Sequence, residues 1–213
     1  MTRRWILVLY LIPAVLLAGG SLPFLSGELD MEIARQFYNE KANLWTYSGK
    51  PPWLQFYRLG AIPALVVAAV ALSVLVLGMG RHRLASSRKL SAFLVLTLLA
   101  GPGLVANFLL KEHWGRPRPN ETEGLGGADP FERLLAIDPA TEGHSFVSVP
   151  ASMGFYFFAA GLALLACRRR KTGILVIVAA GTYGTCIGVA CLAQGLHFAS
   201  DILWSAAVVW FAS

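Results

Sequence analysis

Three short polar clusters contain the residue types that bind and attack a phosphate group. They lie at Lys111–Pro119, Ser145–Ser148 and His197–Asp201, between or beside long apolar stretches. Cations bind phosphate oxygens, a helix start offers free N–H groups to an anion, and a histidine can act as a nucleophile. We therefore predict a phosphate-handling site wherever the fold brings the clusters together.

The first cluster combines Lys111 with Arg116 and Arg118, and each of the two arginines precedes a proline. Proline holds the residue before it in an extended conformation, which limits where the guanidinium group can go. Arg offers a planar fork to phosphate oxygens, whereas Lys acts as a point charge. The alternative is that these cations only anchor a helix end to lipid headgroups.

In the second cluster, Ser148 stands where a helix should begin, followed by Pro150 in the first turn. Ser is a common N-cap and Pro is tolerated just inside a helix start, so a purely structural role would explain both residues. The functional reading adds that free N–H groups and the helix dipole attract anions there.

The third cluster places His197 and Asp201 four residues apart. The two share a face if a helix begins this early, and Asp201 can reach back if the helix begins later. A carboxylate on one ring nitrogen would fix the tautomer and leave the other nitrogen free to attack phosphorus. The alternative is a capping Asp beside an interfacial His.

The elements that must position these clusters are membrane spans. Of 213 residues, 56% are hydrophobic and 14% are charged, too apolar a composition for an ordinary soluble domain. We predict six spans in a single domain over residues 1–213, at about 5–25, 59–80, 90–110, 145–167, 173–192 and 200–213. The last is short for a helix that crosses a bilayer, and we expect either a short span or a truncated sequence.

Charge predicts the orientation of these spans. Ten of the 18 Lys and Arg residues, and none of the 12 acids, fall in three segments on one side: residues 1–4, 81–89 and 168–171. The positive-inside rule then puts both termini in the cytoplasm and all three polar clusters on the outer face. The net charge of +6 therefore needs no nucleic-acid partner. On the outer side we also predict an interfacial helix over Leu29–Asn43.

The three clusters resemble the signature of the type 2 phosphatidic acid phosphatase/haloperoxidase superfamily. That signature reads Lys, six residues, Arg-Pro; then Pro-Ser-Gly-His; then Ser-Arg, five residues, His, three residues, Asp. The chain has the whole first element in Lys111 and Arg118-Pro119, and the last two residues of the third in His197 and Asp201. The surroundings of Ser148 and His197 are similar to the lipid A phosphatase-like branch.

The resemblance implies a role for each matching residue. His197 would attack phosphorus and form a phosphohistidine, and Asp201 would orient it. Lys111, Arg118 and Ser148 would hold the phosphoryl oxygens, together with the backbone at the position of Val149. The site uses no metal and no cofactor, because the cations supply the positive charge and no cluster has the spacing of metal ligands.

The chain departs from the signature at the second and third elements. Val149 replaces the glycine, Pro150 replaces the histidine that protonates the leaving oxygen, and Cys191 replaces the third-element arginine. His144 and His113 are the candidate substitutes for the lost acid. Losing an acid and a cationic clamp would cost about 5–8 kcal/mol in the barrier for a phosphomonoester. A diphosphate bond needs less protonation, so we expect an active enzyme to favour lipid diphosphates.

We therefore predict an all-α integral membrane protein, a six-transmembrane-helix bundle with an outer interfacial helix. Its expected function is that of a membrane lipid phosphatase or phosphotransferase of the bacterial inner membrane, acting at the outer face on the headgroup of a phosphorylated lipid. Lipid A, an undecaprenyl carrier, phosphatidylglycerol phosphate and phosphatidate are all compatible with the sequence. The alternative is a degenerate relative that binds a lipid phosphate, or regulates a partner, without turnover. A transport bundle would explain the hydropathy but none of the three polar clusters. Transporters often interrupt their helices near mid-membrane, and the one hint of such an interruption in this sequence is Pro102.

Overall fold

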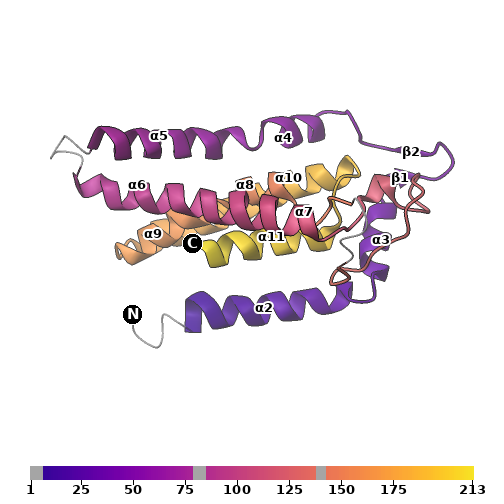
Figure 1. Cartoon of the computed structure of the whole chain (residues 1–213), viewed down its shortest axis with the longest axis horizontal. Helices are drawn as coiled ribbons and strands as arrows, with labels where there is room; N and C mark the ends of the chain where they lie inside the picture. Colours follow the sequence, from indigo (N-terminus) through magenta and orange to yellow (C-terminus); the bar gives the residue numbers. More distant parts are fainter. Residues whose placement is uncertain (1–6, 79–84, 138–142) are drawn as a thin grey trace.

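The computed structural model describes residues 7–78, 85–137 and 143–213, and these form a bundle of roughly parallel and antiparallel helices (Figure 1). The elements, in chain order, are η1 (Leu7–Leu11), α2 (Ile12–Ser21), η2 (Leu22–Phe24), α3 (Glu28–Arg35), β1 (Tyr38–Asn39), β2 (Leu44–Trp45), α4 (Trp53–Leu59), α5 (Ile62–Gly78), α6 (Ala85–Leu98), η4 (Leu99–Leu110), α7 (Lys111–His113), η5 (Pro119–Glu121), α8 (Val149–Phe155), α9 (Phe158–Ala166), α10 (Arg170–Ala193) and α11 (Ala199–Ala212). The all-α fold class predicted from the sequence is confirmed. In the described part of the chain the only sheet is a hairpin of two strands, each two residues long.

Within the described residues, four helical stretches are long and apolar enough to cross a membrane: Trp53–Gly78, Ser87–His113, Val149–Ala166 and Arg170–Ala193. A fifth is possible if Leu9–Phe24 and Glu28–Arg35, which meet at a bend of 74°, count as one broken span. The predicted count of six is not confirmed. The helix Ala199–Ala212 has 14 residues, which cover about 21 Å at 1.5 Å per residue, less than a hydrocarbon core of about 30 Å.

The boundaries of two predicted spans shift for local reasons. The second begins at Trp53 instead of residue 59, directly after Pro51-Pro52. The fourth begins at Val149 instead of residue 145, because Ser148 is its extended N-cap. In the third span, Pro102 lies inside the π-helical segment η4, where its missing N–H disturbs the regular α-helical ladder.

The predicted interfacial helix over Leu29–Asn43 is too long. The helix α3 ends at Arg35, and a small antiparallel hairpin follows in which Tyr38 pairs with Trp45 and Asn39 with Leu44. The turn is stabilised by the Asn39 side chain, whose Oδ1 accepts a hydrogen bond from Ala42 N at 3.1 Å, and Asn43 adopts φ of +49°. Short polar side chains that bond to the nearby backbone compete with helix formation, which explains the early end.

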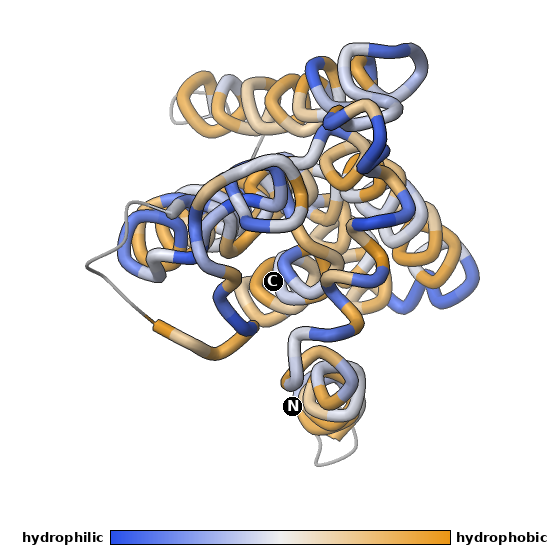
Figure 2. Tube along the Cα trace, turned by 90° about the vertical axis from the view of Figure 1, so that its right-hand side faces the viewer, coloured by the Kyte–Doolittle hydropathy of each residue, from blue (hydrophilic) through white to orange (hydrophobic). Residues whose placement is uncertain are grey.

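The two ends of the bundle differ in character. At one end lie α3, the hairpin, α7 and the loops that carry the three polar clusters (right in Figure 1). Figure 2, which looks at that end, shows hydrophilic segments in front of mainly hydrophobic helices. At the other end, Leu9, Lys89, Arg168 and Ser213 line one pocket of about 830 Å³. The described cations of the segments that we predict to be cytoplasmic therefore gather at the end opposite the polar clusters.

The helices α8 and α10 are in close contact beneath the polar clusters. A Cβ atom on Gly154 would lie 2.6 Å from the Cα atom of Gly184, so the two backbones touch without side chains between them. The close approach holds the start of α8 against the end of α10 and leaves Cys191, near the end of α10, fully buried.

Candidate active site

His197 lies in the short connection between α10 and α11, with 4% of its surface exposed. The connection turns sharply at Gly195, which has φ of +72°, and Leu196 N donates back to Cys191 O at 3.0 Å. The Nδ1 atom of His197 is 2.7 Å from the carbonyl oxygen of Ser145. A carbonyl can only accept a hydrogen bond, so in a neutral ring Nδ1 carries the proton and Nε2 keeps its lone pair. This is the tautomer that a nucleophilic histidine needs.

Asp201 sits in the first turn of α11, and its carboxylate is fully buried. It accepts hydrogen bonds from Phe198 N at 2.8 Å and from Ser145 Oγ at 2.6 Å, and it pairs with Arg116 at 2.5 Å. Its Oδ2 atom is 3.8 Å from His197 Nδ1, which is longer than a hydrogen bond. The predicted direct bond from Asp201 to the ring is therefore corrected: the Ser145 carbonyl holds the ring, because the Asp201 oxygens already serve other donors.

Arg116 is the centre of a buried charge cluster that sequence reasoning did not identify. Its guanidinium group has no exposed surface and pairs with Asp30 at 2.8 Å and with Asp201 at 2.5 Å. It also donates to Ser200 Oγ at 2.8 Å and, through Nε, to the carbonyl of Glu132 at 3.0 Å. Burial alone would lower the pKa of Arg116, but the charges of Asp201 and Asp30 outweigh it and the pKa is raised. Arg116 is therefore charged.

Aromatic rings enclose the same guanidinium. Its Cζ atom lies 4.5 Å from the centre of the Phe198 ring and 5.8 Å from that of Phe131. In the sequence, Arg116 stands out only as one of several clustered cations, and Asp30 is not singled out within the predicted interfacial helix, so the pairing of the two residues was not predicted. The signal that could have found the pair is the position of Asp30 one turn before Ala34, on the buried face of α3.

The two cations predicted to hold phosphate lie near one another, at and just after the C-terminal end of the helical stretch Ser87–His113. Lys111 begins α7, and it is close enough to Arg118 for the two charges to repel. The Arg118 side chain lies 3.7 Å from Glu121 and is 34% exposed. Neither side chain is locked into the buried cluster, so both remain available at the mouth of the site.

The start of α8 is built as the sequence predicts. Ser148 is the N-cap, and its Oγ accepts a hydrogen bond from Ala151 N at 3.3 Å, with Val149 and Pro150 as the next two residues. Its hydroxyl is also within hydrogen-bonding reach of Cys191. Ser205 Oγ donates to the Ser148 carbonyl at 3.0 Å, which ties α11 to this helix start. The second and third clusters therefore meet here.

The family comparison agrees with this geometry. Residues 90–213 match the family model described as the PAP2 superfamily. The chain belongs to the PAP2 superfamily. The resemblance stated from the sequence motifs is thereby confirmed, including its lipid A phosphatase-like branch.

Three relatives carry the same printed name, lipid A 4′-phosphatase. The one from Francisella tularensis subsp. novicida is 32% identical over 189 residues, which cover 87% of this chain and 83% of that protein. The one from Rhizobium leguminosarum is 35% identical over 120 residues, covering 55% of this chain and 50% of that protein. The one from Rhizobium etli is 32% identical over 161 residues, covering 74% and 61%. No solved structure matches the chain. The family and these relatives support a phosphatase that acts on a membrane lipid.

The PAP2 acid is missing at Pro150, and the two candidate substitutes lie in different surroundings. His113 Nδ1 is 3.1 Å from the carbonyls of Phe108 and Leu109, in the last turns of its own helix, so this ring serves the helix end. His144 Nε2 is 3.6 Å from Glu112 Oε2 at the partly exposed mouth. His144 directly precedes Ser145, whose carbonyl holds His197, so it is the better placed of the two.

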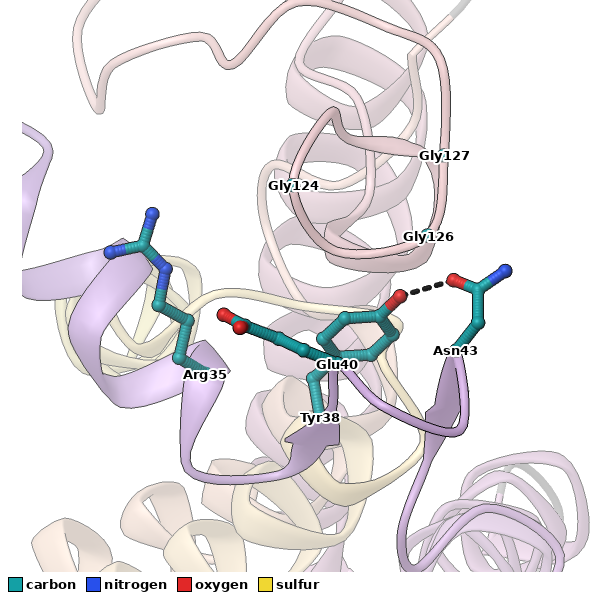
Figure 3. Close-up of a pocket in the computed structure, with 7 residues that line it drawn as sticks. All are labelled: Arg35, Tyr38, Glu40, Asn43, Gly124, Gly126 and Gly127. Atoms are coloured by element: carbon teal, nitrogen blue, oxygen red, sulfur yellow. Dashed lines mark hydrogen bonds between the residues drawn. The ribbon is translucent and has the colours of Figure 1, made fainter.

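A pocket of about 530 Å³ opens at the polar end of the bundle, between the hairpin and the glycine-rich loop (Figure 3). Its lining is polar and consists of Arg35, Tyr38, Glu40, Asn43, Gly124, Gly126 and Gly127, with Tyr38 hydrogen-bonded to Asn43. None of the predicted PAP2 motif residues lines this pocket. Leu125, within the loop, belongs to the same buried hydrophobic cluster as Phe198, the residue after His197. The pocket therefore lies next to the candidate site and not within it. Among the described residues, no three His, Cys, Asp or Glu side chains are grouped so that they could hold a metal ion.

Proposed function

We propose that this PAP2 member is a lipid phosphatase that removes phosphate from a lipid headgroup, with His197 as the nucleophile. The observation that carries the proposal is the distance of 2.7 Å between His197 Nδ1 and the Ser145 carbonyl oxygen. A carbonyl only accepts hydrogen bonds, so this contact assigns the proton of a neutral ring to Nδ1 and leaves the Nε2 lone pair for attack. The printed names of the relatives make lipid A the first substrate to test.

The proposed reaction has two steps. The Nε2 lone pair of His197 forms a bond to phosphorus while the bond to the lipid oxygen breaks, and that oxygen keeps the electron pair. Lys111, Arg118 and the N–H groups at the start of α8, capped by Ser148, stabilise the charge on the phosphoryl oxygens. Water then attacks phosphorus, the N–P bond breaks, and phosphate leaves with the ring restored.

The missing acid limits which lipid oxygen can leave. Pro150 has no proton to give, and Cys191 contributes no positive charge at the arginine position. A lipid alkoxide needs a proton as it leaves, whereas the phosphate of a diphosphate bond leaves readily without one. We therefore propose that a lipid diphosphate is cleaved faster than the corresponding monophosphate, with His144 as the candidate donor where a proton is required.

The test is phosphate release by the purified protein from lipid A, a lipid monophosphate and a lipid diphosphate, with His197→Ala as the control. We expect release that His197→Ala abolishes and a monoester-to-diphosphate rate ratio below one. The double variant Val149→Gly/Pro150→His restores the family residues, and it should raise the monoester rate by roughly 10²–10⁴-fold if the lost acid limits turnover. Val149→Gly alone is the matched control, since it adds space but no proton donor.

The second candidate function is binding of a lipid phosphate without turnover. The observation that favours it is that Pro150 stands in place of the family histidine and Cys191 in place of the family arginine. In that case no lipid releases phosphate, yet the lipid still binds, and binding is lost in Lys111→Ala or Arg118→Ala. We propose further that the site faces the periplasm and both termini face the cytoplasm of a bacterial inner membrane.

A further inference from the structure

We infer that Asp30, Arg116 and Ser145 are positioning residues, which act as one hydrogen-bonded chain through Asp201 to hold the His197 ring with Nε2 free. The inference rests on the proposed role of His197 as nucleophile. It extends the site to residues whose identity the three family motifs do not specify, including one on the helix α3.

The last link of the chain is a backbone carbonyl. His197 Nδ1 is 2.7 Å from Ser145 O, whereas the nearest Asp201 oxygen is 3.8 Å away. The position of the Ser145 carbonyl therefore decides both the tautomer and the direction of the ring. A shift of this carbonyl would turn Nε2 away from the phosphate or allow the proton to move to Nε2.

Ser145 is itself held at two points. Its hydroxyl donates to Asp201 Oδ2 at 2.6 Å, and its backbone N–H donates to the carbonyl of Arg116 at 2.9 Å. The residue has no exposed surface, so no water replaces these bonds. Asp201 thus orients His197 indirectly, through the residue whose carbonyl touches the ring.

The far end of the chain fixes Asp201. Arg116 pairs with Asp201 and Asp30, and Asp30 also accepts from Ser200 N at 3.0 Å and from the Ser200 hydroxyl. All of these side chains are fully buried. The interactions join α3, the loop after α7 and the start of α11. The outer helix is therefore part of the support of the nucleophile.

The charges of the cluster, like its geometry, suit the proposed chemistry. When Nε2 bonds to phosphorus, the imidazole ring gains a positive charge. The Asp201 carboxylate lies beside the ring, with Oδ2 3.8 Å from Nδ1, where it can offset this charge. Replacing Asp30 with Asn keeps the shape and removes one of the two carboxylates that pair with Arg116.

The experiment measures the His197 tautomer by nitrogen NMR on the full chain, labelled with ¹⁵N-histidine and kept in detergent. The chain has four histidines, and the His197 signal is identified by its absence in His197→Ala. We expect the Nδ1–H tautomer in the wild type. Asp30→Asn and Ser145→Ala should each lower the fraction of this tautomer, and each should reduce kcat on lipid A roughly 10–100-fold with little change in KM.

The controls separate positioning from folding and from the proposed function. Glu32 lies on the exposed side of the same helix α3, and Glu32→Gln should keep the wild-type tautomer and the wild-type kcat. Asp30→Asn combined with Ser145→Ala should lose no more activity than the worse single variant, because both act on one chain. The inference is overturned by an Nε2–H tautomer in the wild type, by an unchanged tautomer in both single variants, or by additive losses. If Asp30→Asn does not fold, the Ser145→Ala variant and the wild-type tautomer still test the inference. If the wild type releases no phosphate, the proposed function fails while the tautomer measurement still tests the chain.

Discussion

At the scale of single residues, the least expected feature is a fully buried arginine between two carboxylates. A buried charge is costly unless its hydrogen bonds are satisfied, and Arg116 satisfies its own with Asp30, Asp201, Ser200 and the Glu132 carbonyl. The cluster depends most on Arg116, because loss of the arginine would remove the cation that pairs with both carboxylates.

Replacing Arg116 with Met should be strongly destabilising. Two buried carboxylates would lose the cation that pairs with both of them, and removing one partner of such a pair costs roughly 3–5 kcal/mol. Arg133→Met is the matched control, because Arg133 is exposed and we expect its loss to change stability by less than about 0.5 kcal/mol. The thermal midpoint of each variant in detergent provides the measurement, and equal midpoints would show that the Arg116 cluster contributes nothing to stability.

At the scale of elements, the candidate active site depends on how closely α8 and α10 approach. Gly154 faces the backbone of Gly184, and Gly184 in turn faces the ring of Phe155. Small residues at such a crossing let two backbones touch, which is the usual way that helices associate in a membrane. The approach keeps Ser148, at the start of α8, beside the last turns of α10 that lead to His197.

Gly154→Ala should therefore force the two helices apart. The new Cβ would lie 2.6 Å from a backbone atom, which cannot move aside as a flexible side chain could. We expect a loss of about 1–3 kcal/mol in stability, together with reduced phosphate release. Gly19→Ala is the control, because Gly19 is also helical and nothing lies within 4 Å of its Cβ position. A Gly154→Ala protein as stable and active as Gly19→Ala would show that the close approach is not required.

At the scale of the whole molecule, the bundle separates a polar end from an end rich in cations. The polar clusters, α3 and the hairpin share one end, while Lys89 and Arg168 lie at the other (Figure 1). Positively charged loops are retained in the cytoplasm, so this separation favours an outward-facing site. The orientation can be tested with the native cysteines, because they differ in exposure.

Cys167 is exposed at the cationic end, Cys186 is partly buried and Cys191 is buried. In cells with a permeable outer membrane, a membrane-impermeant maleimide should label Cys167 only after the inner membrane is opened. Glu40→Cys in a Cys167→Ser background provides the opposite control. Glu40 is exposed beside the hairpin at the polar end, so in the proposed orientation it should react before the inner membrane is opened. Labelling of Cys167 in intact cells would reverse the proposed orientation.

The sequence by itself determined the features that depend on neighbouring residues. Hydropathy is a property of a contiguous stretch, so four apolar spans could be placed to within a few residues. The cap at Ser148 is equally local, since its hydroxyl bonds to an N–H three residues ahead. The motif residues Lys111, Arg118, His197 and Asp201 could be found because their spacing along the chain is itself the signal.

Only the tertiary structure decided which groups touch across the bundle. Asp30 and Arg116 are 86 residues apart in sequence, and Asp30 and Ser200 are 170 apart, so no local pattern links them. The partner of His197 was equally hidden, because a backbone carbonyl is present in every residue and only packing selects the one at Ser145. The physical reason is that buried polar groups must be satisfied, and the partner that satisfies each one is set by how the helices pack.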